Sequence, residues 1–300
     1  MYATYFGLRE LPFGLTPDPS YFFACSSYRE ALDTLLVAAF NGEGFIKIIG
    51  EVGHGKTLLC RTFLAALQDA GEPQTGVPRV SMAVGGQRKF VTAYLPNPYT
   101  DPRGLLLALA QEFSVEVDRS VDLHMLTTAV TAGLIKIAQE GKHALVCLDE
   151  VQAMPQVTLE AVRLLTNLET EKRKLLQVVL FGQPELDQKL REHGARQMLQ
   201  RITFQYKLAG LREHEIAAYL DHRLRIAGRE GGGLFTPAAV RLLHRYSGGT
   251  PRLVNILAHK ALMLAFGEGS REIGPRQIKA AAADTPAAFP PRGFLKWLRQ

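Results

Sequence analysis

Apolar and polar residues follow two alternating patterns along the first two thirds of the chain. Short apolar runs of strand length occur at residues 45–49, 90–95, 144–148, 176–181 and 202–208. Segments with helical spacing of apolar positions lie at 31–40, 56–70, 102–113, 123–139, 158–169 and 185–199. Several runs are apolar throughout, which is typical of parallel strands covered by helices on both faces. The pattern therefore predicts an α/β fold with a parallel sheet.

The strand signal stops after Leu211. Helical patterns follow at residues 213–227, 237–246, 251–266 and 275–283, and the last three open with a proline at the first-turn position. We therefore expect a core domain over residues 1–210, a small α-helical lid domain over 211–285, and a basic, aromatic tail over 286–300.

Two segments of the core are expected to lack regular structure. Residues 6–23 mix aromatic side chains with three prolines, which predicts an extended N-terminal segment over 1–25 that packs its rings onto another part of the molecule. Residues 71–89 are rich in glycine, proline and polar residues, which predicts a mobile loop. The first helix is expected to be capped by Ser26 or Ser27, with Glu30 completing a capping box.

A glycine-rich segment, Gly50-Glu-Val-Gly-His-Gly-Lys-Thr57, follows the first apolar run and opens a helix. This is the context that a phosphate-binding loop requires, because its backbone N–H groups and the helix N-terminus attract phosphate oxygens. Lys56 is expected to reach the β- and γ-phosphates of ATP, and Thr57 to place its hydroxyl on Mg²⁺. The predicted nucleotide-binding residues of the loop are Gly50, Glu51, Val52, Gly53, His54, Gly55, Lys56, Thr57 and Leu58.

Two carboxylates, Asp149 and Glu150, end the apolar run at 144–148. Open α/β sheets bind ligands at the carboxyl ends of their strands. Asp149 is therefore expected to hold the Mg²⁺ shell, and Glu150 to orient or deprotonate the attacking water. By itself, an apolar run that ends in Asp-Glu usually marks only a strand that enters a loop. Together with the upstream phosphate-binding loop, it indicates a nucleotide site.

Gln183 follows the apolar run at 176–181. Its amide could act as a sensor that donates a hydrogen bond to the γ-phosphate or the water. The alternative is a loop amide that caps the helix beginning near Pro184.

Further segments of the chain carry a family resemblance. They include Leu148-Asp-Glu-Val-Gln-Ala-Met-Pro155, Leu164-Leu-Thr-Asn-Leu-Glu-Thr170, Phe181-Gly-Gln-Pro-Glu-Leu186, Gln200-Arg-Ile-Thr-Phe204 and Gly248-Gly-Thr-Pro-Arg-Leu-Val-Asn-Ile256. Together with the phosphate loop, they resemble AAA+ ATPases of the ExeA/MshM/TniB group over nearly the whole chain. They are most similar to its MshM branch, accessory ATPases of mannose-sensitive haemagglutinin (type IV) pilus biogenesis.

The resemblance implies a P-loop AAA+ fold, bound Mg-ATP and roles for two arginines. Arg201 matches the arginine finger that completes a neighbouring subunit's site, with Arg196 as an alternative, and this implies a homo-oligomeric ring. Arg252 matches the second sensor arginine, which reaches the γ-phosphate within its own subunit. A surface position is the alternative for either arginine. The chain departs from its relatives at His54, where they carry a smaller residue, and in the longer 71–89 segment.

Charge and cysteine content bear on the possible partners of the protein and on its compartment. The formal net charge is +6, and the residues from Lys207 onward hold fifteen Lys/Arg against seven Asp/Glu. This basic third could face nucleic acid, anionic lipid or an acidic partner, or be a solvated face of arginine-rich helices. Three cysteines without C-x-x-C spacing indicate small buried side chains in a reducing compartment. With no membrane-length apolar stretch and no secretory pattern, we expect a cytoplasmic protein or one peripheral to the inner membrane.

Two classes of function fit these features. The first is an ATPase that supports assembly of a type IV (MSHA-like) pilus or a type II secretion machine, with assembly proteins at the inner membrane as partners. The second is a DNA-transaction ATPase of the TniB transposition-helper type, which is less favoured because no helix-turn-helix or zinc module is visible. A nucleotide-controlled adaptor with little turnover is a weaker third hypothesis, since the Asp149–Glu150 pair is intact.

Overall fold

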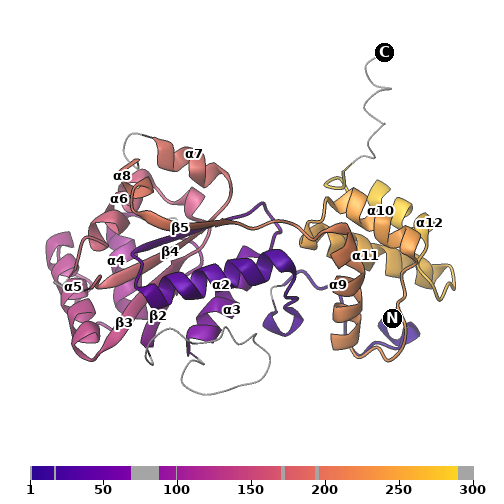
Figure 1. The fold of residues 1–300 in the computed structure, drawn as a ribbon, viewed down its shortest axis with the longest axis horizontal. Coiled ribbons are helices and arrows are strands. Elements are labelled where there is room, and N and C mark those ends of the chain that lie inside the picture. Colours follow the sequence, from indigo (N-terminus) through magenta and orange to yellow (C-terminus); the bar gives the residue numbers. More distant parts are fainter. Residues whose placement is uncertain are drawn as a thin grey trace, which may run out of the picture. The chain divides into compact units, whose positions relative to one another are not determined.

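The computed structural model describes residues 2–16, 18–68, 88–98, 100–169, 173–192 and 196–289. By its internal contacts the chain groups into two compact units. The sheet unit consists of residues 29–52 and 56–208, and the helical unit of residues 1–28, 53–55 and 209–300. Figure 1 labels the helices and strands of both. Most of the predicted 71–89 loop and of the 286–300 tail lies outside the described residues.

A five-stranded sheet forms the centre of the sheet unit. Its strands are β1 (Phe45–Ile49), β2 (Lys89–Leu95), β3 (Lys142–Leu148), β4 (Leu176–Gly182) and β5 (Ile202–Lys207). They lie in the order β2-β3-β4-β1-β5, and every neighbouring pair is parallel. The predicted α/β fold with a parallel sheet is confirmed.

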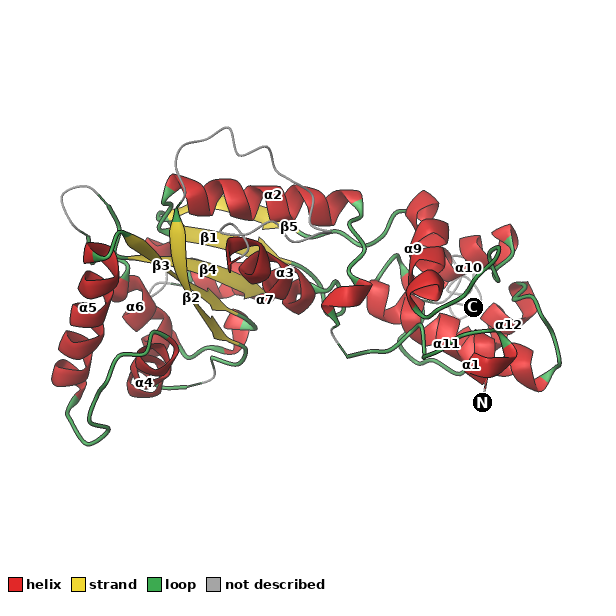
Figure 2. Cartoon of the chain, turned by 90° about the horizontal axis from the view of Figure 1, so that it is seen from below, coloured by secondary structure: helices red, strands yellow, loops and turns green. Residues whose placement is uncertain are grey.

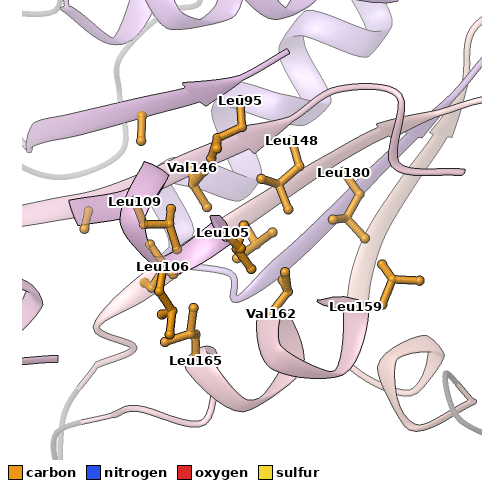
Figure 3. Packing of buried hydrophobic residues seen from close by; sticks show 14 of the residues in the cluster. Leu95, Leu105, Leu106, Leu109, Val146, Leu148, Leu159, Val162, Leu165 and Leu180 are labelled. Carbon is orange, nitrogen blue, oxygen red and sulfur yellow. The ribbon is translucent and has the colours of Figure 1, made fainter. Parts of the chain in front are cut away.

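Helices cover both faces of this sheet. They are α2 (Ser26–Asn41), α3 (Lys56–Gln68), α4 (Pro102–Glu112), α5 (Leu123–Gln139), α6 (Gln156–Leu165), α7 (Glu185–Arg191) and α8 (Arg196–Leu199). One face of β3 and β4 packs its apolar side chains against α4, α5 and α6. Figure 3 shows Val146, Leu148 and Leu180 of this face together with leucines of α4 and α6. Figure 2 shows α2 on the other side of the strands.

The opposite face carries the alternate residues of the same strands, because successive side chains of a strand point to opposite faces. Cys147, Val179 and Phe181 are fully buried there. The side-chain amide of Gln177, on the same face, donates to the carbonyl of Ala39 in α2 at 3.1 Å. Burial on both faces explains why these runs contain few polar residues.

Two predicted helices of the core have different bounds. The helix predicted over 158–169 is α6, which begins at Gln156 and ends at Leu165, because the chain turns at Thr166 and Glu169 then bridges to Lys174. The single helix predicted over 185–199 is wrong. Helix α7 ends at Arg191, the next residue is extended with ψ of 152°, and α8 is separate. A glycine at 194 in the sequence disfavours a continuous helix here.

The prediction that Ser26 or Ser27 precedes and caps the first helix is wrong, because α2 already begins at Ser26. The side chains of the predicted capping box make tertiary hydrogen bonds. The hydroxyl of Ser26 donates to Glu215 at 2.9 Å, and that of Ser27 accepts from the backbone of Ala209 at 2.9 Å. The carboxylate of Glu30 accepts from the hydroxyl of Tyr206 at 2.8 Å.

Four helices dominate the helical unit: α9 (Glu213–Ile226), α10 (Pro237–Ser247), α11 (Pro251–Gly267) and α12 (Pro275–Ala283). Proline is the first residue of the last three, where its missing N–H leaves no hydrogen bond unmade. The predicted C-terminal helical region is therefore present. In the described ranges, no helix of either unit is both long and apolar enough to span a membrane.

The N-terminal segment groups with the helical unit, whereas its sequence predicts that residues 1–25 belong to the core. It includes the short helices α1 (Tyr2–Tyr5) and η1 (Pro19–Tyr21), so the expectation of no regular structure is wrong at these positions. Its rings are packed as predicted. Phe13 lies edge-on to Phe235, with ring centres 6.0 Å apart, and both Phe6 and Phe13 are buried.

Three arginines of the helical unit donate to backbone carbonyls of this N-terminal segment. Arg223 donates to Pro12 at 2.6 Å, Arg229 to Phe6 at 2.7 Å, and Arg271 to Tyr5 at 2.6 Å. Three arginine side chains of the C-terminal third are therefore engaged in hydrogen bonds within the chain. The three cysteine side chains are buried, which confirms their prediction as small buried side chains.

Candidate functional site

The glycine-rich loop lies between β1 and α3, as predicted. Gly53 and Gly55 have φ of 83° and 78°, in the left-handed region that glycine adopts without steric cost. A Cβ atom on Gly55 would lie 1.7 Å from the hydroxyl of Tyr28. That hydroxyl donates to the carbonyl of His54. The loop therefore requires glycine at position 55 for both conformation and space.

Lys56 begins α3 and is 5% exposed. Its Nζ donates to the carbonyls of Gly50 at 2.8 Å and Glu51 at 3.3 Å, so the ammonium is folded back onto its own loop. Burial lowers the pKa of Lys56, and the nearby carboxylates of Glu150 and Asp149 oppose that shift. A strongly charged anion would be attracted to this poorly solvated cation.

Thr57 and Asp149 form the second element of the site. The Thr57 hydroxyl donates to Asp149 Oδ2 at 2.6 Å, and the hydroxyl of Tyr94 approaches the same oxygen at 3.4 Å. Asp149 is 1% exposed, and burial raises its pKa although the hydrogen bond from Thr57 opposes the rise. A carboxylate and a hydroxyl oxygen are thus held side by side in a buried position.

Glu150 and Gln183 form the third element. Gln183 Nε2 donates to Glu150 Oε2 at 2.9 Å, across the ends of β4 and β3. The side-chain amide of Gln152 donates to the same carboxylate oxygen. Glu150 has φ of 54°, a left-handed conformation that is uncommon outside glycine and often marks functional sites. Helix α7 has no side-chain cap, so the alternative role predicted for Gln183 is not the one observed.

Strand order explains why these residues meet. β4 lies between β1 and β3, and all three strands run in the same direction. Their carboxyl ends therefore lie at one edge of the sheet, which is where open α/β sheets bind ligands.

A family model described as "AAA domain" matches residues 40–190, which is half of the chain. The chain belongs to this AAA domain family. Its five-stranded parallel sheet and its likeness to solved structures of this fold confirm the AAA+ fold expected from the sequence.

A curated relative, General secretion pathway protein A of Aeromonas hydrophila, is 40% identical over 282 residues. The match covers 94% of this chain and 48% of that protein, so the chain spans about half the length of its relative. This similarity supports the ExeA-type group within the family.

Solved AAA structures share the fold at low identity. The Aeropyrum pernix ORC2 protein, in ADPNP and ADP complexes, superposes with a TM-score of 0.66 at 17% identity, covering 97% of this chain and 75% of that one. The Thermotoga maritima RuvB Holliday junction branch migration motor gives a TM-score of 0.55 at 15% identity, covering 88% and 70%. At these identities the likeness shows the fold alone.

The structure places five of the predicted site residues at one edge of the sheet. Thr57 is hydrogen-bonded to Asp149 and Gln183 to Glu150, whereas Lys56 is bonded to its own loop. The side chains of Glu51 and Val52 are exposed, and Leu58 is half-buried.

Of the two predicted arginines, Arg252 contacts the glycine-rich loop, whereas Arg201 contacts another part of the sheet unit. Arg201 precedes β5, and its guanidinium donates to the side chain of Asn167. Arg252, at the start of α11, donates its backbone N–H to the carbonyl of Gly53 at 3.3 Å, within the helical unit. The side chain of the alternative finger, Arg196, lies outside the described residues.

Sequence reasoning missed Tyr94 and Gln152 as residues of the site. Gln152 lies in a segment that resembles the family and Tyr94 in the apolar run at 90–95, but neither carries a charge that would suggest chemistry. Gln152 stands two residues after Glu150, and this spacing from a catalytic candidate was the one available signal.

The residues present fit a bound magnesium ion. Among the described residues, no group of three or more His, Cys, Asp or Glu side chains could hold a metal by themselves. Mg²⁺ in nucleotide sites uses one or two protein oxygens and completes its shell with phosphates and water. The Thr57 hydroxyl and the Asp149 carboxylate supply such a pair.

Proposed function

We propose that the chain binds ATP together with Mg²⁺ and hydrolyses it. The observation that carries this proposal is the placement, at the carboxyl ends of β1, β3 and β4, of the loop residue Lys56, the hydrogen-bonded pair Thr57–Asp149 and the hydrogen-bonded pair Glu150–Gln183. The lysine and the two pairs would each meet a different requirement of phosphoryl transfer, namely phosphate binding, metal binding and control of the attacking water.

Lys56 and the Thr57–Asp149 pair bind the nucleotide. The ammonium of Lys56 exchanges the loop carbonyls for β- and γ-phosphate oxygens, which compensate its burial better because they are anionic. Thr57 and Asp149 hold Mg²⁺, which when bound neutralises charge on the phosphates. The backbone N–H groups of residues 50–58 complete the phosphate cradle.

Glu150 and Gln183 act on the water. The carboxylate of Glu150 accepts a hydrogen bond from the attacking water and orients or deprotonates it. Gln183, whose amide donates to that carboxylate in the structure, is assigned the sensor role toward the γ-phosphate or the water.

Arg252 is assigned the second sensor role, in which a guanidinium meets the γ-phosphate of its own subunit. Its backbone contact with loop residue Gly53 supports this assignment, because both belong to the same compact unit. A planar guanidinium suits the charge that develops on a transferred phosphoryl group.

Arg201 is assigned the arginine finger of a homo-oligomeric ring. Its present partner, Asn167, is neutral, so moving the guanidinium to a neighbour's γ-phosphate would break no ion pair between those two residues. A finger supplied by another subunit can raise turnover by roughly 10³–10⁵. Such head-to-tail contacts close into rings.

The process served is assembly of a type II secretion machine or a related type IV (MSHA-like) pilus. The 40% identity to General secretion pathway protein A supports a role in the secretion machine. The resemblance of the motif residues to MshM supports a role in the pilus branch. The proposed partners are assembly proteins at the inner membrane, with the chain in the cytoplasm or peripheral to that membrane.

A DNA-transaction role of the TniB type is the second candidate, and the excess of Lys/Arg after residue 207 is what favours it. Three of those arginines already donate to carbonyls of the N-terminal segment, so fewer of their N–H groups remain for hydrogen bonds to phosphates, although their charge is unchanged. We therefore favour the assembly role.

One experiment separates these roles. Replacing the chromosomal gene by a Glu150→Gln version in the source organism should abolish either the secretion of enzymes or the formation of surface pili. The purified protein should bind duplex DNA weakly at physiological salt. Normal secretion and piliation, together with tight, salt-sensitive DNA binding that stimulates turnover, would overturn the assembly role.

A further inference from the structure

Gln152 bridges two loops of the proposed ATP site. It lies in the 3-10 helix η3 (Val151–Ala153), directly after Glu150. Its Nε2 donates to Glu150 Oε2, and its Oε1 accepts from the backbone N–H of Gln183 at 3.0 Å. Both ends of the amide are used, one at the end of β3 and the other at the end of β4.

The backbone around Gln152 is held firmly. Lys189 of α7 donates to the carbonyls of Gln152, at 2.9 Å, and of Met154. The side chains of Val151 and Met154, on either side, are fully buried. The backbone that carries Gln152 is therefore anchored to α7, and the direction of its amide is set by the two hydrogen bonds to Glu150 and Gln183.

The two amides that donate to Glu150 differ in what they can do. Gln183 is assigned to the γ-phosphate or the water, so the two N–H groups of its amide are shared between that ligand and Glu150 when nucleotide is present. Gln152 has its other end on a backbone N–H and lies in η3, so its N–H groups remain for the carboxylate. Of the two amides, Gln152 is therefore the one whose contact with Glu150 has no competing assignment.

We propose that Gln152 is a positioning residue that holds the Glu150 carboxylate in its working orientation and links it to the Gln183 loop. The inference rests on the proposed ATP hydrolysis. It deepens that function by assigning a role to a residue that touches neither nucleotide nor metal. Gln152 acts through Glu150, so its loss lowers the rate of turnover and leaves nucleotide affinity unchanged.

Two variants separate the donor end of the amide from its acceptor end. Gln152→Met has similar length and removes both hydrogen bonds. Gln152→Glu keeps an oxygen for the Gln183 N–H but replaces the donor to Glu150 by a carboxylate. The matched control is Gln156→Met, because the side-chain amide of Gln156 is buried without a hydrogen-bond partner among the described residues.

The measurements are steady-state kcat and KM for Mg-ATP, the Kd of a fluorescent ATP analogue, and thermal unfolding, all on the full chain. Both Gln152 variants should lower kcat by roughly ten- to a hundredfold, the range that corresponds to a hydrogen bond to a charged group. Their Kd values should stay within about twofold of wild type, which is a much smaller change than the expected fall in kcat. Gln156→Met should match wild type in both.

Every other result counts against the inference. A wild-type kcat in Gln152→Glu would show that the donor end of the amide does not matter. A rise in Kd that parallels the fall in kcat in both variants would show a structural role. If Gln152→Met fails to fold, the Gln152→Glu result decides. Absence of turnover in the wild-type protein overturns the proposed function itself, and is thereby distinguished from a failure of the inference alone.

Discussion

Arg223 offers a sharp test of how the N-terminal segment is held in the helical unit. It lies on α9 and is 7% exposed. Its Nε donates to the carbonyl of Pro12 at 2.6 Å, with longer bonds to Gly14 at 3.4 Å and to the Tyr219 hydroxyl at 3.3 Å. Its guanidinium carbon lies 4.5 Å from the centre of the Tyr21 ring.

The variant Arg223→Met keeps the aliphatic volume and removes these interactions. The short bond to Pro12 is charge-assisted and corresponds to about 1.5–3 kcal/mol, whereas the two long bonds add little. The contact with Tyr21 contributes about 1–2 kcal/mol in a desolvated setting. Methionine relieves the desolvation of a buried cation, which offsets part of this loss. The carbonyls of Pro12 and Gly14 lose their donor, so we expect a net destabilisation of about 2–4 kcal/mol.

Native-state proteolysis measures this effect without requiring the whole chain to unfold in one step. Trypsin cleaves after Arg9, which is protected while its backbone N–H bonds the carbonyl of Ala227 at 2.7 Å. When opening is fast relative to cleavage, a loss of 2 kcal/mol raises the cleavage rate about thirtyfold. The control is Arg225→Met, an exposed arginine of the same helix. Equal cleavage rates in the two variants would refute the reasoning.

Three further predictions concern the site. Gly55→Ala should abolish binding of a fluorescent ATP analogue, because φ is 78° and the added Cβ would lie 1.7 Å from the Tyr28 hydroxyl; wild-type affinity would contradict this. Because burial raises the pKa of Asp149 from its ordinary 3.8, its contribution to stability is fully present below 3.8 and is lost as pH rises through the folded-state value. The free energy of unfolding of nucleotide-free wild type should therefore fall relative to Asp149→Asn over that range, whereas parallel pH profiles would argue against a buried carboxylate. Mixing Arg201→Ala with Lys56→Ala subunits should restore part of the turnover, and a confirmed mixed assembly without rescue would place the finger elsewhere.

Much of the core could be predicted because its signals are local. The apolar runs marked the strands, since a sheet covered on both faces leaves few polar positions along a strand. Asp149, Glu150 and Gln183 were found because each follows a strand directly, and parallel strands bring those positions to one edge. The glycine pattern before Lys56 added a second local signal at the same edge.

The remaining features depend on contacts between distant parts of the chain. Arg223 binds the carbonyl of Pro12 across 211 positions, and nothing in the local pattern of α9 distinguishes it from an exposed arginine such as Arg225. The aromatic residues of the N-terminal segment show that it packs against another part of the chain, but not against which unit. Its sequence position next to the core therefore predicts the core, whereas it groups with the helical unit. Gln152 is polar and uncharged, so only the geometry of its hydrogen bonds shows its place in the site.

The central claim is that Glu150 acts on the water while Lys56 binds the nucleotide. The most direct test measures Mg-ATP turnover and ATP affinity in the wild-type protein and in the Glu150→Gln and Lys56→Ala variants. Glu150→Gln should bind ATP about as tightly as wild type and lose roughly 10²–10⁴ in turnover, the range of general acid–base catalysis. Lys56→Ala should lose binding. Equal loss of ATP affinity in both variants, or wild-type turnover in Glu150→Gln, would contradict the account.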